Sequence, residues 1–206
     1  MTRDELVEVV ESRLGLRTGL NSRVTAEVKM AQRTLEAGTV LPWFIKKCVP
    51  ITIPPTPLVT PTGFIREPED VPGVRLTISA KLVPLKKDDY DFLIRRTDLY
   101  PGTGTPLFYA WNSKGYHFFP APDATYTGEV EAYFHDDVLA ASGTENAWSR
   151  ELPEILIAQA GLAMAFTLRS AESVALFKDS LAEAMKKLND MNQAHDVSGR
   201  TLVIGG

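Results

Sequence analysis

The sequence predicts an α+β protein: an antiparallel helical bundle with an inserted antiparallel β domain. Two observations predict this class. Apolar residues recur at helical spacing near both ends of the chain, whereas the middle is rich in proline, aromatic and β-branched residues. We expect N-terminal helices of the bundle over residues 1–40 and a β-rich domain over 41–147. A C-terminal helical hairpin over 148–194 and an extended tail over 195–206 complete the expected organisation.

The first forty residues predict a pair of helices. Residues 2–14 form the first, with Thr2 as its cap and Gly15 as its stop. Asn21 or Ser22 is expected to cap the second, which runs to about residue 37. A short loop joins the two helices, so we expect them to pack antiparallel.

Proline shapes the segment that follows. Five prolines lie between Pro50 and Pro61, and β-branched residues separate several of them. Proline has no amide hydrogen to donate, so this segment is expected to be extended or to form an edge strand. Residues 64–67 and 74–78 are further short strand candidates, and residues 87–96 suggest a short helix capped by Asp88.

Residues 106–134 predict three consecutive antiparallel strands. A turn over 112–115 separates the first two, and Pro120 and Pro122 precede the third. In the third, Val130 and alternate residues form one face, while Glu129, Glu131 and Tyr133 form the other.

The C-terminal part predicts a helical hairpin and a tail. Pro153 suits the first turn of one helix, and Ser170 is expected to cap the next. Ala158, Gly161 and Ala165 are small, which permits the close approach of a neighbouring helix. The tail holds an apolar Leu202-Val203-Ile204 that has no evident place in the chain's own core, so it is expected to be disordered or to order on a partner.

Composition narrows the function classes. The 206 residues carry a formal net charge of −4, which argues against a general nucleic-acid binder. The single cysteine, Cys48, excludes an intramolecular disulfide framework and fits a reducing compartment. No signal-peptide pattern and no apolar run of roughly 20 residues occurs. We therefore expect a soluble intracellular product.

The sequence offers little for catalysis, a metal or a cofactor, and we expect none. His117, His135 and His195 are isolated from one another, and His135-Asp136-Asp137 is better explained as a solvated loop than as a metal site. His117 is expected on a sheet face, and Cys48 is expected to be structural. The aromatic residues of 106–134 are expected in the core and in subunit contacts rather than stacked on bases.

Several ordered motifs resemble those of the head-to-tail adaptor (connector) proteins of tailed bacteriophages, including tail-tubular or gatekeeper-type adaptors. After the N-terminal helix pair these are LPWF at 41–44, FIRE at 64–67, KDDYDFL at 87–93, GxPxxYA at 104–110, GYxFxPxP at 115–122, the 126–134 strand, NxW at 146–148 and the 152–169 helix. Each motif alone mainly describes a fold, and their order carries the resemblance, which covers nearly the whole chain.

The resemblance implies a structural virion protein, made in the host cytoplasm and located at the head–tail junction. Such a protein forms a homo-oligomeric ring, usually a dodecamer, beneath the portal protein. It contacts a downstream tail or nozzle protein and continues the channel through which double-stranded DNA passes. In this family the C-terminal segment commonly docks on the portal. Carried onto this chain, the candidate docking residues are Val197, Arg200, Leu202, Val203 and Ile204.

Two alternatives stay open from the sequence. One is a tail-associated enzyme that cleaves peptidoglycan, for which Glu129 and Glu131 are the candidate carboxylates, although a solvated strand face explains them more simply. The other is a different connector component such as a stopper, against which the long C-terminal hairpin argues.

Overall fold

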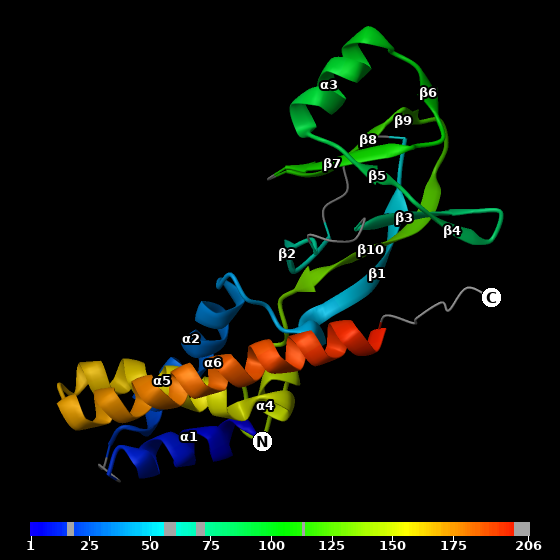
Figure 1. The fold of residues 1–206 in the computed structure, drawn as a ribbon. Coiled ribbons are helices and arrows are strands. Elements are labelled where there is room, and N and C mark those ends of the chain that lie inside the picture. Colours follow the sequence, from blue (N-terminus) through cyan, green and yellow to red (C-terminus); the bar gives the residue numbers. More distant parts are fainter. Residues whose placement is uncertain (16–18, 56–60, 69–72, 113, 200–206) are drawn as a thin grey trace. The chain divides into compact units, whose positions relative to one another are not determined.

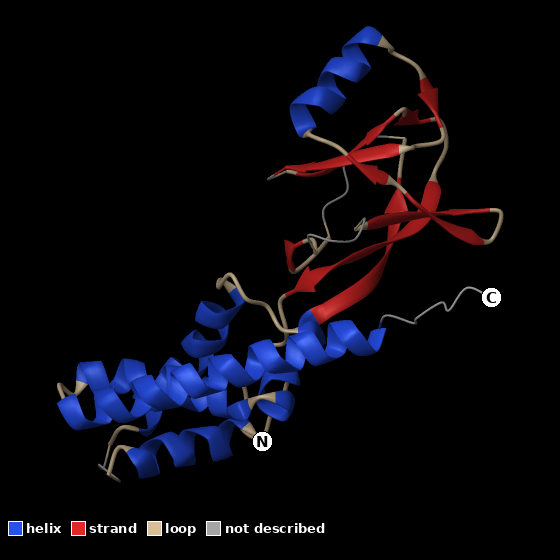
Figure 2. Cartoon of the chain, in the orientation of Figure 1, coloured by secondary structure: helices blue, strands red, loops and turns tan. Residues whose placement is uncertain are grey.

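The chain divides into two compact units, each with its own core. The first comprises residues 1–45 and 136–206, and the second comprises residues 46–135 (Figure 1). The computed structural model describes residues 1–15, 19–55, 61–68, 73–112 and 114–199, with the backbone alone over 196–199. Helices make up the first unit, whereas every described strand lies in the second (Figure 2). The α+β class is confirmed.

Helix α5 is central to the first unit. It contacts α1, α2, α4 and α6, and it is buried on several sides, which suits its almost wholly apolar sequence. The elements are α1 (Arg3–Arg13), α2 (Asn21–Glu36), the 3₁₀ turn η1 (Trp43–Ile45), α4 (Ala147–Glu151), α5 (Pro153–Thr167) and α6 (Ala171–Gly199).

Local sequence accounts for most helix ends. Thr2 and Glu5 form a capping box at α1, as the polar side chains there predict. Pro153 starts α5. The Ser170 hydroxyl accepts a hydrogen bond from the Ser173 amide, which confirms the predicted cap of α6. The cap predicted for α2 is wrong: Asn21 is already the first helical residue, and Leu20 precedes it without a side-chain hydrogen bond.

The second unit contains three sheets and one helix. Its elements are β1 (Lys46–Ile53), β2 (Phe64–Arg66), β3 (Val74–Ile78), β4 (Lys81–Pro84), β5 (Lys86–Lys87), α3 (Tyr90–Leu99), β6 (Thr103–Gly104), β7 (Phe108–Asn112), β8 (Gly115–Phe119), β9 (Ala121–Pro122) and β10 (Tyr126–Phe134). The largest sheet has the order β1-β10-β3-β4, with β2 also paired to β10. Because β1 lies at the end of this order, Pro50 is in an edge strand, as its missing amide hydrogen predicts.

The predicted three-stranded meander is wrong in its last step. Strands β7 and β8 pair antiparallel, but β10 leaves them and pairs with β1, β2 and β3. Pro120 and Pro122 interrupt the ladder between β8 and β10, and the short β9 there pairs in parallel with β6. β5 and β7 are also parallel, so the β domain is not purely antiparallel.

The face predicted for β10 is confirmed. Val130, Ala132 and Phe134 are buried in one core with residues of β1, β3, β7 and β8. Gly128 permits the close approach of β3, since a Cβ atom there would lie 2.3 Å from the Arg75 carbonyl oxygen. The short helix α3 also forms, although its cap is Asp89 rather than the predicted Asp88.

Candidate interaction surfaces

The C-terminal end of α6 is held by the segment that leads into η1. The Asn192 side chain accepts a hydrogen bond from the Trp43 amide (3.1 Å) and donates one to the Leu41 carbonyl (3.0 Å). The His195 imidazole stacks on the Trp43 indole, with ring centres 4.6 Å apart and planes 8° from parallel. These contacts fix the C-terminal end of α6 to residues 41–43, so the segment that follows α6 begins at a fixed position on the first unit.

The predicted portal-docking residues lie at and beyond this end. Helix α6 continues to Gly199, so the segment from residue 195 begins as helix rather than as an extended tail. No proline or glycine interrupts residues 190–198, which explains the continuation. Val197 is within the helical backbone, and Arg200, Leu202, Val203 and Ile204 lie outside the described residues.

A buried polar cluster joins α2 to the loop before α4, and the sequence did not predict it. We define it as Gln32, Glu36, Asp136, Asn146 and Ser149, all at most 9% exposed. The Gln32 side-chain amide donates to the Glu36 carboxylate (2.8 Å) and to the Asp136 backbone carbonyl (3.1 Å), and the Asn146 side-chain amide donates to the Gln32 side-chain oxygen, Oε1 (3.1 Å). The predicted solvated loop is therefore wrong at Asp136, whose carboxylate accepts a hydrogen bond from the Ala147 amide (2.6 Å). The available signal was the i,i+4 spacing of Gln32 and Glu36 on the apolar side of α2.

A charge network crosses one face of the largest sheet. It consists of Lys46, Arg75, Glu129 and Glu131. Arg75 pairs with both glutamates, at 2.8 Å to Glu129, and Lys46 pairs with Glu131 at 2.6 Å. Burial raises the pKa of Glu131, but the hydrogen bonds and charges of Lys46 and Arg75 outweigh it, so the net pKa is lowered. A glycosidase acid needs a raised pKa, so this geometry does not favour these carboxylates as catalytic groups.

Glu67 is a buried acid of the β unit, 8% exposed. Its Oε2 accepts hydrogen bonds from the Tyr109 hydroxyl (3.2 Å) and pairs with Lys87 (2.7 Å). The Tyr109 hydroxyl in turn accepts a bond from the Gly73 amide (2.8 Å). Burial and the nearby Glu67 charge raise the pKa of Tyr109, so this phenol stays neutral. These bonds connect the residue that follows β2 and the residue that precedes β3 with β5 and β7.

His117 and Cys48 were the other residues considered as catalytic or metal-binding groups. His117 lies on β8 and meets the Tyr90 ring edge-on, which confirms its sheet-face position. Burial and Lys114 lower the pKa of His117. Cys48 is exposed on β1. Within the described residues, no group of three histidine, cysteine or acidic side chains is arranged to hold a metal ion.

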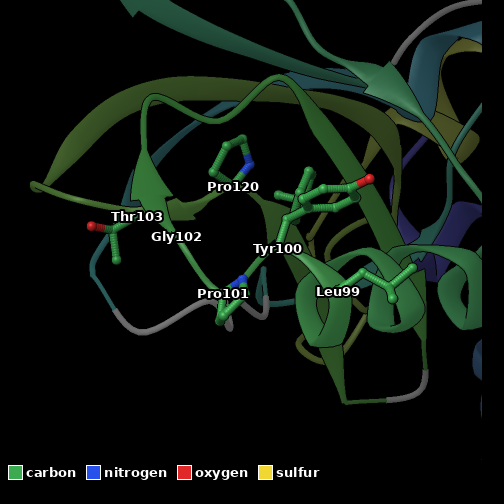
Figure 3. Close-up of a pocket in the computed structure, with 7 residues that line it drawn as sticks. Leu99, Tyr100, Pro101, Gly102, Thr103 and Pro120 are labelled. Atoms are coloured by element: carbon green, nitrogen blue, oxygen red, sulfur yellow. The ribbon is translucent and has the colours of Figure 1, made fainter.

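Several large apolar side chains are exposed on the β unit, among them residues at the end of α3 and on β4. Leu99, the last residue of α3, and Tyr100, which follows it, are 72% and 68% exposed and line a shallow, open surface depression (Figure 3). Strand β4 presents Leu82 and Val83, 50% and 39% exposed.

None of the helices described has the length and apolar character that crossing a bilayer requires.

The sequence was compared with protein-family models and with curated proteins. A search of curated proteins found no match to this sequence. A protein-family model described as SU10 adaptor protein matches residues 1–204, which is almost the whole chain. This match confirms the resemblance drawn from the ordered motifs, and the chain belongs to the SU10 adaptor protein family of phage structural adaptors.

Proposed function

We propose that this protein assembles as a ring at the head–tail junction of a phage virion and joins the portal protein to the downstream tail or nozzle protein. The helices of the first unit act as an antiparallel bundle, and the β unit is inserted between α2 and α4. The family match over residues 1–204 is the observation that carries this proposal. A dodecamer is the expected ring, and the subunits are made in the host cytoplasm before they join the virion.

The C-terminal segment is the proposed portal-docking element. Its candidate residues are Val197, Arg200, Leu202, Val203 and Ile204, and the anchored end of α6 supports this assignment. Since Asn192 and His195 contact the 41–43 segment, each subunit of a ring would present its C-terminal residues from the same position. Less entropy is lost when a docking segment starts from an ordered anchor.

The central opening of the ring is proposed to continue the DNA channel. The formal net charge of −4 on each subunit supports passage of DNA through the channel without tight binding to its wall. Each lysine or arginine bound to a phosphate adds affinity, so an acidic subunit favours sliding over binding.

Electron microscopy and mass measurement of purified portal rings mixed with this protein test the proposal. The expected result is an added ring with a central opening and a mass that corresponds to about one copy per portal subunit. Portal rings that gain no mass at saturating protein would contradict the adaptor function.

The peptidoglycan-cleaving alternative is not favoured. It requires a carboxylic acid that holds its proton near neutral pH, and Glu131 has the opposite shift, with Arg75 bound to both candidate glutamates.

A further inference from the structure

Helix α6 extends past the start of its partner α5. The two helices pack together, and Glu154 in the first turn of α5 pairs with Lys187 of α6 at 3.5 Å. Helix α6 continues beyond Lys187 to Gly199 (Figure 1). We call residues 189–199 the overhang, because the start of α5 lies opposite the turn of α6 that precedes them.

The overhang buries few side chains. Leu188, just before it, is 1% exposed, whereas none of the side chains over residues 189–195 is buried. Met191 and Asn192 are the half-buried ones among them. A helix segment with little buried surface opens at a small cost in free energy. Specific contacts of the overhang therefore decide how much of the time it is held in place.

These contacts form a clamp on a neighbouring segment of the chain. The Asn192 side chain accepts a hydrogen bond from the Trp43 amide (3.1 Å) and donates one to the Leu41 carbonyl (3.0 Å). The His195 ring stacks on the Trp43 indole. We define the clamp as these three contacts. Because one side chain satisfies two backbone groups of the same segment, the overhang and residues 41–43 are ordered together.

The clamped segment leads directly into the β unit. Phe44 packs edge-on against Trp148 of α4, with ring centres 5.3 Å apart, and Ile45 is fully buried. Strand β1 begins at the next residue, Lys46. The clamp therefore acts on the residues through which the chain enters the β unit.

We propose that the clamp couples portal docking to the order of residues 41–43. When the residues after Gly199 bind the portal, the overhang loses its freedom to open, and the closed clamp is favoured. Such coupling is reciprocal, so an intact clamp raises the affinity for the portal by the same factor by which docking favours the closed clamp. Docked and free copies then differ in the segment that precedes β1. This inference rests on the proposed portal docking and adds its effect within the subunit.

Hydrogen exchange at the Trp43 amide reports the clamp directly, because this amide donates to Asn192. Exchange is measured for the full chain alone and bound to purified portal rings, together with its affinity for those rings. Asn192→Ala removes both hydrogen bonds of the clamp, and Gln193→Ala, at the exposed neighbouring position, is the matched control. Urea unfolding of each variant verifies that the fold is retained.

His195 provides a second pair of variants. His195→Ala, at an exposed position, removes the stack on Trp43 and leaves the two hydrogen bonds of Asn192. His195→Phe keeps an aromatic ring opposite the indole and should restore most of the parent's behaviour.

In the parent and in Gln193→Ala, portal binding is expected to slow exchange at Trp43. In Asn192→Ala, exchange in the free protein should be faster and portal binding should slow it less. The affinity of Asn192→Ala for the portal should fall by about fivefold or more, and His195→Ala should show a smaller loss in the same direction.

Equal portal affinity of Asn192→Ala and the parent would overturn the coupling and leave the clamp as a purely structural contact. Equal slowing of Trp43 exchange by the portal in both proteins would also overturn it, because the protection would then not depend on the clamp. Both results keep the adaptor function. If the parent does not bind portal rings, the adaptor function itself fails and the coupling fails with it.

Discussion

The ring of Phe177 occupies the space that a side chain at Gly161 would need. A Cβ atom at position 161 would lie 2.2 Å from the Phe177 ring, so the glycine lets α5 and α6 pack at this separation. Phe177 is fully buried at the contact. The close packing of α5 against α6 at this point therefore requires the small Gly161 opposite the large Phe177.

Gly161→Ala is expected to destabilise the protein by about 1–3 kcal/mol, the usual effect of overpacking, although alanine is the better helix former. Urea unfolding of the full chain measures the change. Adding Phe177→Leu should recover part of the loss. A Gly161→Ala variant as stable as the parent would contradict the close packing.

Gln32→Ala is expected to cost about 1–3 kcal/mol, because Glu36 and Asn146 would lose a partner while still buried. Thermal and urea unfolding measure this loss. Gln193→Ala, at an exposed position of α6, is the matched control and should have little effect. Equal effects of the two changes would show that the buried polar cluster does not contribute to stability.

The charge network predicts a loss of stability in acid. The folded pKa of Glu131 lies below its ordinary value of 4.5, so the folded state binds fewer protons than the unfolded state. The contribution is complete above about pH 4.5 and falls as the pH decreases through the folded pKa.

Glu131→Gln should reduce the decrease in the free energy of unfolding at low pH. Glu8→Gln, at an exposed position of α1, should leave that decrease unchanged. The free energy of unfolding, measured from neutral pH down to about pH 3, provides the comparison. An unchanged slope in Glu131→Gln would contradict the assignment.

Tyr109→Phe is expected to cost about 1–3 kcal/mol, since the Gly73 amide and Glu67 lose a buried hydrogen-bond partner. Tyr100→Phe removes a hydroxyl from a residue that is 68% exposed, so it should be nearly neutral. Chemical denaturation of both variants decides this prediction, and a neutral Tyr109→Phe would contradict it.

Trp43→Ala should loosen the end of α6, because it removes the stacking partner of His195. Hydrogen exchange of the amides over residues 190–199 is expected to accelerate, with little change over α5. Phe166→Ala, at an exposed aromatic residue of α5, serves as the control and should leave that region unchanged. Unaltered exchange in Trp43→Ala would mean that the stack does not hold the helix end.

The elements that the sequence predicted well depend on local chemistry. The Thr2 cap, the start of α5 at Pro153 and the alternation along β10 each follow from a few neighbouring residues. The edge position of Pro50 follows from its missing amide hydrogen.

The features that the sequence did not predict depend on distant partners. β10 pairs with β1, a strand about eighty positions earlier, and no local pattern specifies that choice. The buried Glu36 accepts hydrogen bonds from Gln32 of its own helix and from the Asp136 amide, and no local pattern identifies Asp136, a hundred positions away, as a partner. The predicted docking residues stay a prediction, with Val197 placed only as helical backbone and the other four beyond the described chain.

Binding to purified portal rings, compared between the full chain and a chain that ends at Gly199, tests the central claim most directly. Ending there removes residues 200–206 and leaves α6 with its contacts to Trp43. We predict that the full chain adds a ring to the portal and that the shortened chain binds far more weakly. No binding by the full chain would contradict the adaptor function, whereas equal binding by both chains would contradict the docking role of the C-terminal segment.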